Sequence, residues 1–139
     1  ILSKKDSYIT AASTPEGAEF GYVFMNCRLI HDEKTTSVYL GRPWRSYAKT
    51  VFIGCELGDH IRTEGWHNWS KPYAEKTTFY AEYGNSGPGA AAHEERVKWS
   101  HELKAKDLKK YTPENVLQCG SEQDKNGKDI KVDWYFKVF

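Results

Sequence analysis

Short runs of alternating apolar and polar residues fill the first 83 positions of the chain, and turn-forming residues separate them. Alternation with a period of two is typical of a β-strand that has one buried face. Five runs fit this pattern: Tyr8–Ala12, Tyr22–Ile30, Ser37–Leu40, Thr50–Leu57 and Thr77–Tyr83. The pattern therefore predicts an all-β structure of short strands that are linked by compact turns.

Two of these runs are copies of each other. The segment Val23–Leu29 aligns with Val51–Leu57 at an offset of 28 residues, and Thr78–Tyr83 resembles a third copy. A spacing of this size is typical of a coil of short strands, in which each turn stacks on the one before it. Alternation alone supports an antiparallel sandwich equally well, so the repeat by itself leaves both architectures open.

The repeat also predicts which side chains form the core. Alternation places Val23, Met25, Cys27 and Leu29 on one face, together with the corresponding residues of the second copy. Cys27 and Cys55 occupy equivalent positions, so we expect them to stack about 4.8 Å apart on adjacent coils. We expect buried free thiols there and no disulfide.

The chain changes character after Tyr83. Gly84–Ala90 is rich in glycine and predicts a surface loop. Ser100–Lys110 predicts a short helix, and Thr112-Pro113-Glu114 resembles a second helix start with Pro at its first position. The aromatic segment Trp134-Tyr135-Phe136 is expected to dock onto the body of the protein.

Length and charge restrict the class of protein. We expect a single domain over 1–139, with coils in 1–83 and a loop, short helices and a C-terminal extension in 84–139. Lys and Arg number 20 against 19 Asp and Glu, so no excess positive charge exists to hold nucleic acid. No run approaches the roughly 20 apolar residues that a membrane-spanning helix needs. Neither nucleic acid nor a membrane is therefore expected as a partner.

The first residues suggest that the numbering starts inside a longer polypeptide. The chain does not begin with Met, it has no basic start followed by an apolar run, and the strand-like Ser7–Thr10 follows almost at once. In that case the strand edges of the first coil lack the coil that normally covers them. We then expect self-association through this N-terminal coil.

The candidate chemistry lies in Gly41-Arg42-Pro43-Trp44, which ends a predicted strand. Arg42 offers a fixed fork of donors to a carboxylate, and Trp44 offers a flat apolar face to a sugar ring. The pair therefore suits an acidic or esterified sugar. The plainer alternative is that Arg42 forms a structural ion pair and that Trp44 belongs to the core.

Seven stretches resemble the C-terminal part of the pectin methylesterase (pectinesterase) family and occur in the family's order. They are Ser7–Ala12, Gly21–Cys27, Tyr39–Trp44, Gly58–Ile61, Gly65-Trp66, Tyr80–Ala90 and Arg96–Trp99. The resemblance covers about residues 7 to 119. It implies a right-handed parallel β-helix with a substrate groove along one side. It also implies a secreted, periplasmic or cell-surface enzyme of pectin catabolism and cell wall modification.

The reaction that the resemblance implies is hydrolysis of the C6 methyl esters of polygalacturonate, the backbone of pectin, to free carboxylate and methanol. In the family, which is one of aspartyl carbohydrate esterases, one Asp attacks the ester carbonyl and a second Asp protonates the leaving methoxide, then activates water. Glutamine amides stabilise the oxyanion. These residues belong to a part of the family that precedes Ser7, so we expect this chain alone to be inactive. No cofactor is implied.

Four residues match family positions at the groove. Arg42 would orient the nucleophilic carboxylate and keep it ionised, and Trp44 would stack on the sugar at the reacting subsite. Tyr47 and Trp69 would contact flanking sugars. A non-catalytic carbohydrate-binding or structural β-solenoid is the alternative function.

Three histidines, His31, His60 and His67, are the candidates for a zinc site. Their spacing matches no usual ligand pattern, so no metal site is expected from the sequence.

Overall fold

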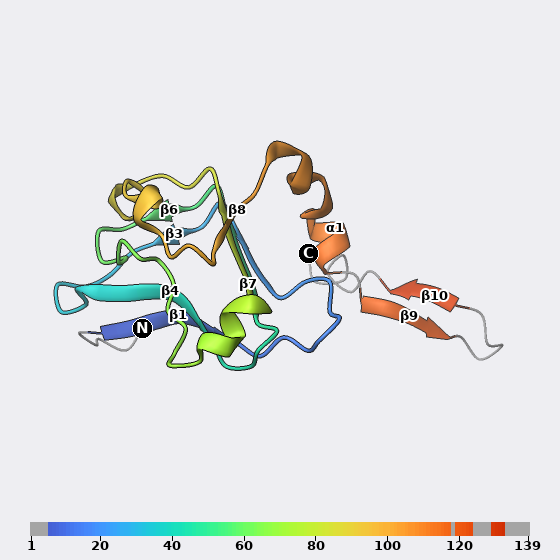
Figure 1. The fold of residues 1–139 in the computed structure, drawn as a ribbon. Helices are drawn as coiled ribbons and strands as arrows, with labels where there is room; N and C mark the ends of the chain where they lie inside the picture. Colours follow the sequence, from blue (N-terminus) through green and yellow to red (C-terminus); the bar gives the residue numbers. More distant parts are fainter. Residues whose placement is uncertain (1–5, 118, 124–128, 133–139) are drawn as a thin grey trace. The chain divides into compact units, whose positions relative to one another are not determined.

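A computed structural model describes residues 6–117, 119–123 and 129–132 of the chain (Figure 1). The chain forms two compact units, Ile1–Leu103 and Lys104–Phe139. The expectation of one domain over the whole chain stays a prediction. The described part of the first unit contains eight strands: β1 (Asp6–Ala12), β2 (Tyr22–Met25), β3 (Arg28–Leu29), β4 (Ser37–Pro43), β5 (Lys49–Ile53), β6 (Glu56–Leu57), β7 (Phe79–Tyr83) and β8 (His101–Glu102).

Every strand pairing among the described residues of the first unit is parallel. β1 pairs with β4, β3 pairs with β6, and a four-stranded sheet has the order β2-β5-β7-β8. The chain thus forms β1, β2 and β3 in one coil, and β4, β5 and β6 then stack on them in the next coil. Isolated parallel bridges from Val38 to Ile61 and from Glu56 to Ser86 continue the two smaller sheets into a third coil. The predicted coil is confirmed, and the sandwich is excluded.

The repeat in the sequence is the repeat of the coils. Tyr22 pairs with Thr50, and Arg28 pairs with Glu56, both at the offset of 28 residues. β7 then pairs with β5 at an offset of 30, from Lys49 with Phe79 to Ile53 with Tyr83. The segment Thr78–Tyr83 is therefore a third copy, as the sequence predicted.

A corner divides each of the long predicted strands. Tyr22–Ile30 is split into β2 and β3 at Asn26, and Thr50–Leu57 is split into β5 and β6 at Gly54. Both corner residues have a positive φ, 53° for Asn26 and 62° for Gly54, a conformation that Asn and Gly adopt most easily. A Cβ on Gly54 would lie 2.8 Å from the Asn26 side-chain oxygen, so the upper corner has no room for one.

The predicted core is confirmed in part before the corner, because both faces of β5 are buried and the main hydrophobic cluster lies on the face that was not predicted. The main hydrophobic cluster contains Phe52, with Phe24 packed against it, and their rings stack at 4.5 Å. Val51 and Ile53 are buried outside that cluster. Alternation does not continue through a left-handed residue, so the phase changes there. After the corner Cys27 and Leu29 pack against the cluster as predicted.

Both Cys27 and Cys55 are free thiols, as the sequence predicted. Cys55 is buried and Cys27 is half-buried, and the pairings on either side of them carry the same offset. Burial raises the pKa of the Cys55 thiol. Cys55 is therefore a packing residue of the coil and a weak nucleophile.

Single-turn 3₁₀ helices interrupt the loops of the first unit: η1 (Pro72–Lys76), η2 (Pro88–Ala90) and η3 (His93–Glu95). The glycine-rich loop that the sequence predicted thus ends in η2. The helix predicted from Ser100 is wrong at its start, because His101 and Glu102 form β8 on the edge of the main sheet.

The residues of the second unit that the structure describes form few regular elements. They are η4 (Ala105–Lys110), α1 (Pro113–Val116) and an antiparallel hairpin of β9 (Cys119–Gln123) and β10 (Asp129–Val132). The predicted second helix is confirmed: Pro113 begins it, and the Thr112 hydroxyl accepts a bond from the Asn115 amide. The aromatic segment 134–136 lies outside the described residues. None of the helices in the described part has the length and apolar character that crossing a membrane requires.

Candidate functional site

Arg42 lies near the end of β4, where the side chain is held between two aromatic rings. Its guanidinium carbon is 4.6 Å from the centre of the Tyr8 ring and 4.1 Å from the centre of the Trp69 ring. Tyr8 comes from β1, the strand beside β4. Stacking on two rings fixes the plane of the guanidinium and therefore the directions of its N–H donors.

Trp44 extends this stack toward solvent. Its ring lies 5.4 Å from that of Trp69, and the Trp44 residue is 51% exposed. Lys71 closes the arrangement, since its ammonium donates to the Trp44 carbonyl and lies 4.8 Å from the Trp69 ring. The plainer alternative for Trp44, a core position, is wrong.

A sharp turn delivers Trp69 to Arg42. Trp69 and Ser70 both have a positive φ, near 52° and 57°. The Asn68 side chain holds this turn, because its oxygen accepts from the Ser70 amide and its nitrogen donates to Glu75 in η1. Consecutive non-glycine residues in this conformation are costly and are found where the surroundings impose them.

Beneath the arginine, Tyr8, Tyr39 and His67 form a ladder across three coils. Tyr8 and Tyr39 are in register on β1 and β4 and stack at 5.5 Å, and His67 stacks on Tyr39 at 4.9 Å. The Tyr8 hydroxyl and His67 Nδ1 share a hydrogen bond of 2.8 Å. Burial, followed by the charges of Arg62 and Arg42, lowers the pKa of His67. The ring is thus held neutral beside two guanidinium groups.

The arrangement presents positive charge and flat apolar faces together. We call Arg42, Trp44, Trp69, Lys71 and Tyr8 the arginine–aromatic cluster. Arg42 Nε is buried and has no hydrogen-bond partner within the described part of the chain. A buried donor of this kind is costly unless an acceptor reaches it. A carboxylate is the acceptor that a guanidinium fits best.

The predicted site residues divide into two groups. Arg42, Trp44 and Trp69 come together in the cluster. Tyr47 is engaged elsewhere, since its hydroxyl is hydrogen-bonded to the Glu16 carboxylate, and that bond raises the Tyr47 pKa. Sequence reasoning missed Tyr8, His67 and Lys71. Tyr8 could have been predicted as a site residue only from its register with Tyr39 on the next coil.

A sequence model described as Pectinesterase matches residues 2–120. The chain belongs to the pectinesterase family. Pectinesterase 4 of Arabidopsis thaliana is 40% identical over 108 residues, and a probable pectinesterase/pectinesterase inhibitor 6 of the same plant is 41% identical over 120 residues. These matches cover 73% and 84% of this chain, but 18% and 21% of the relatives.

Solved pectin methylesterases have the same fold as this chain. The structure from carrot matches with a TM-score of 0.71 and 28% identity, over 80% of this chain and 38% of the carrot chain. The structure from Yersinia enterocolitica matches with a TM-score of 0.64 and 29% identity, over 78% and 40%. The fold is the right-handed parallel β-helix that the resemblance implied. The chain spans about a fifth of the length of its curated relatives.

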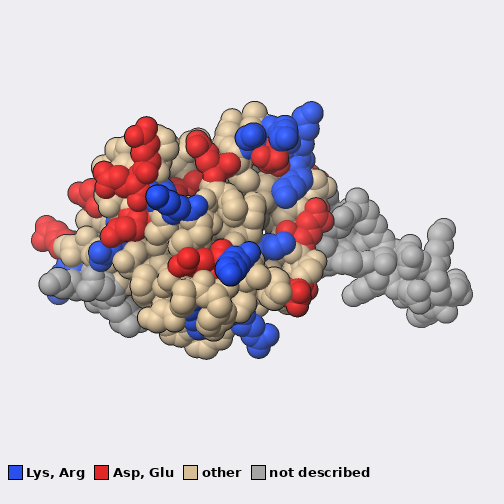
Figure 2. All heavy atoms as spheres, in the orientation of Figure 1, with Lys and Arg blue, Asp and Glu red and all other residues tan. Residues whose placement is uncertain are grey.

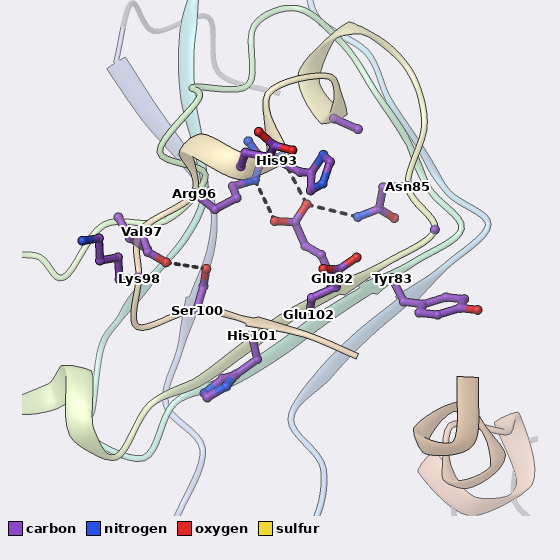
Figure 3. A pocket seen from close by; sticks show the side chains of 13 residues that line it. Glu82, Tyr83, Asn85, His93, Arg96, Val97, Lys98, Ser100, His101 and Glu102 are labelled. Carbon is purple, nitrogen blue, oxygen red and sulfur yellow. Dashed lines mark hydrogen bonds and ion pairs between the residues drawn. The ribbon is translucent and has the colours of Figure 1, made fainter. Parts of the chain in front are cut away.

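A cavity of about 480 Å³ lies away from the predicted site residues, at the end of the coils where β7 and β8 pair (Figure 3). Its floor contains the Glu82–Arg96 ion pair at 2.8 Å, which is 15% and 7% exposed. Asn85 donates to the same carboxylate. Glu82 is thus committed to structural bonds and is a poor candidate for a nucleophile, so the arginine–aromatic cluster remains the candidate site.

Proposed function

We propose that this chain supplies the distal part of the substrate groove of a pectin methylesterase, a carboxylic ester hydrolase that converts C6 methyl esters of polygalacturonate to free carboxylate and methanol. The observation that carries the proposal is the Arg42 guanidinium, which is stacked between Tyr8 and Trp69 with its Nε buried and unpaired within the described residues. Such a donor suits the nucleophilic carboxylate that this reaction needs.

Arg42 then has two effects on that carboxylate. Its positive charge favours the ionised form, which is the nucleophile, and its fork determines which oxygen faces the ester carbon. The attacking Asp, the second Asp that serves as acid and then base, and the glutamines of the oxyanion site are proposed to lie on coils that precede β1. The chemistry needs no metal or organic cofactor, because carboxylates supply both the nucleophile and the proton.

The rest of the cluster fits the sugar. Trp44 is half exposed and presents a flat face beside Arg42, and Trp69 lies behind it. Lys71 adds positive charge, which attracts galacturonate carboxylates in partly de-esterified pectin. Tyr47 is proposed to border flanking subsites. Pectin methylesterases in complex with hexasaccharides are among the structural neighbours, at 26% and 25% identity.

Access to pectin places the proposed enzyme outside the cell or at its surface. Nucleic acid is not a proposed partner, because basic and acidic side chains both occur on the face in view (Figure 2) and their totals nearly balance. Within the described residues, β1 is the edge of a two-stranded sheet, and its open edge supports the proposed self-association. Light scattering tests this: a clean monomer contradicts it.

The central test is a methanol-release assay on methyl-esterified polygalacturonate. We expect no measurable turnover from the 139-residue chain alone. In the longer enzyme, Arg42→Ala should lower kcat by roughly tenfold to a few hundredfold, because one charge-assisted hydrogen bond of about 1.5–3 kcal/mol is lost from the transition state. Trp44→Ala is the matched control and should act substantially through KM. An Arg42→Ala variant with normal kcat and a raised KM contradicts the proposed role.

A non-catalytic carbohydrate-binding solenoid is the second candidate, because the arginine–aromatic cluster can stack on and attract an acidic sugar without any chemistry. The coils before β1 discriminate the two. If they carry no paired Asp residues with nearby Gln, the binding function replaces the esterase.

A further inference from the structure

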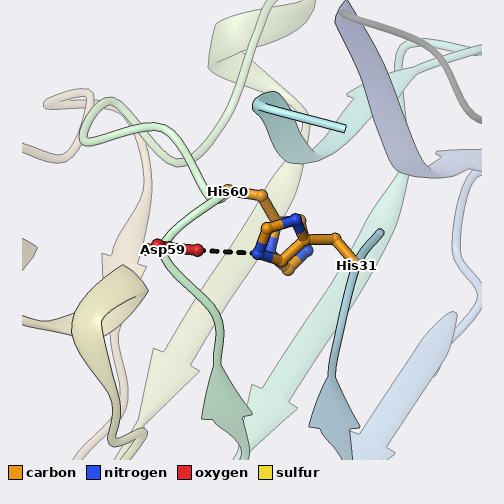
Figure 4. Close-up of side chains that lie close together, drawn as sticks. All are labelled: His31, Asp59 and His60. Atoms are coloured by element: carbon orange, nitrogen blue, oxygen red, sulfur yellow. Dashed lines mark hydrogen bonds and ion pairs between the residues drawn. The ribbon is translucent and has the colours of Figure 1, made fainter. Parts of the chain in front are cut away.

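Three side chains of the types that ligate metals lie together at a corner of the coils, although no metal site was expected from the sequence. His31 follows β3, and Asp59 and His60 follow β6. Since β3 and β6 pair in register at the offset of 28 residues, Asp59 lies one coil above His31. Figure 4 shows the two imidazole rings overlapping in the view, with the Asp59 carboxylate directed at a ring nitrogen of His31. His67, the other histidine considered from the sequence, belongs instead to the tyrosine ladder.

The distances are close to those of a metal site. His31 Nε2 lies 2.7 Å from an Asp59 carboxylate oxygen, and the His31 and His60 ring centres are 4.4 Å apart. One ligand atom from each of the three residues lies within 4.8 Å of the other two. Ligands of a tetrahedral zinc ion are about 3.3 Å apart, given metal–ligand bonds of about 2.0–2.1 Å. The ligand atoms must therefore move closer together, and the Asp59 side chain, which is 72% exposed, has the most room to do so.

His60 is the fixed member of the three. It is 3% exposed, and its Nδ1 is buried without a hydrogen-bond partner in the described residues. Gly58 approaches this nitrogen so closely that a Cβ there would lie 2.6 Å from it. Burial, and then the charge of His31, lowers the pKa of His60. The buried and closely packed ring of His60 can therefore serve as the fixed ligand of the three.

We propose that His31, Asp59 and His60 bind a divalent transition-metal ion, with Zn²⁺ as the expected occupant, and that the ion ties two successive coils together. Two imidazoles and one carboxylate are borderline ligands that suit Zn²⁺ and its first-row neighbours, whereas Mg²⁺ and Ca²⁺ require oxygen ligands. The fourth position is left for water. This site stabilises the solenoid, is separate from the arginine–aromatic cluster, and does not depend on the esterase activity.

A proton competes with the metal at His31. Its Nδ1 faces the Asp32 carbonyl at 2.8 Å and its Nε2 faces Asp59, so both nitrogens meet acceptors. The Asp32 carbonyl, followed by the Asp59 carboxylate, raises the pKa of His31. The metal must displace this proton from the nitrogen that it binds. The titration is therefore made above neutral pH, where imidazole is free to bind a metal.

The test is calorimetric titration of the full 139-residue chain with ZnCl₂ after treatment with chelator, together with Tm in ZnCl₂ and in EDTA. We expect one saturable site and a higher Tm with Zn²⁺, and no such effect with Mg²⁺. His31→Asn and Asp59→Asn each remove one ligand from an exposed position and should weaken Zn²⁺ binding at least tenfold. His93→Asn, at an exposed histidine in η3, is the matched control and should bind as the parent does.

Two outcomes overturn the proposal. One is the lack of saturable Zn²⁺ binding in the parent chain above neutral pH, which would leave His31 and Asp59 as a simple ion pair. The other is equal Zn²⁺ affinity in the parent, His31→Asn and Asp59→Asn, which would locate the ion elsewhere. Substitution with Co²⁺ provides a separate readout, because its visible absorption reports the coordination directly and does not require a change in stability.

Discussion

The buried and the exposed side chains of the coils are stacked by the same repeat of 28 residues. The repeat places similar residues together in the interior but different residues together at the surface. Inside, strand residues at the offset of 28 meet like with like, as Phe24 meets Phe52. Outside, the same offset brings unlike groups together, as in Arg28 with Glu56 and His31 with Asp59. The same repeat thus produces hydrophobic packing in the interior and pairs of complementary polar groups at the surface.

The interior should respond most strongly to truncation. Phe52 is fully buried and contacts both Phe24 and Trp66, so Phe52→Ala should lower the free energy of unfolding by about 3–5 kcal/mol. Trp44→Ala removes a larger ring from the surface and should cost no more than about 1 kcal/mol. Urea denaturation of both variants measures the contrast. Equal losses would show that the outer stack contributes to the fold as much as the core does.

Two ion pairs, one nearly buried and one exposed, allow the same comparison between interior and surface for charged groups. Arg96 and Glu82 are 7% and 15% exposed, and the Arg96 guanidinium also donates to the carbonyls of Arg62, Thr63 and Gly89. Arg96→Ala leaves a nearly buried carboxylate without its cation, so it should destabilise the protein by about 3 kcal/mol.

The exposed pair is the matched control. Arg28 and Glu56 are 71% and 51% exposed at 2.7 Å, and a pair in that setting contributes below about 1 kcal/mol. Arg28→Ala should therefore change the unfolding midpoint little, and added salt should weaken its effect further. Similar costs for Arg96→Ala and Arg28→Ala would show that burial is not what separates the two pairs.

The sequence could predict the strands and the coil because both follow from local alternation and a fixed offset. It could not predict the corners, since Asn26 and Gly54 reset the alternation by adopting a left-handed backbone. The arginine–aromatic cluster was predictable only in part. Arg42 and Trp44 lie on or beside a strand, but Trp69 and Lys71 come from a turn whose length follows no repeat. The proximity of His31 and Asp59 could be predicted only once the register of β3 with β6 was known.

The smallest expected effect at neutral pH concerns a buried polar atom in the core. The Tyr80 ring is fully buried against Trp66 at 4.3 Å, and its hydroxyl is without a hydrogen-bond partner in the part of the chain that the structure describes. Tyr80→Phe keeps the ring and removes a hydroxyl that is desolvated without compensation. The free energy of unfolding should therefore stay within about 0.5 kcal/mol of the parent or rise slightly.

The parent and Tyr80→Phe should differ in stability at alkaline pH, and the direction of the difference follows from the burial of Tyr80. Burial raises the pKa of the Tyr80 phenol well above its usual value of about 10, so the folded chain keeps this proton where the unfolded chain releases it. The parent should lose stability as the pH rises above about 10, and Tyr80→Phe should lose less. Tyr73→Phe, at a 61% exposed residue, is the control for removal of one tyrosine. If parent and Tyr80→Phe unfold with the same pH dependence, the Tyr80 hydroxyl is ionised as easily in the folded coil as in the unfolded chain, and the interior is more polar at this rung than the packing indicates.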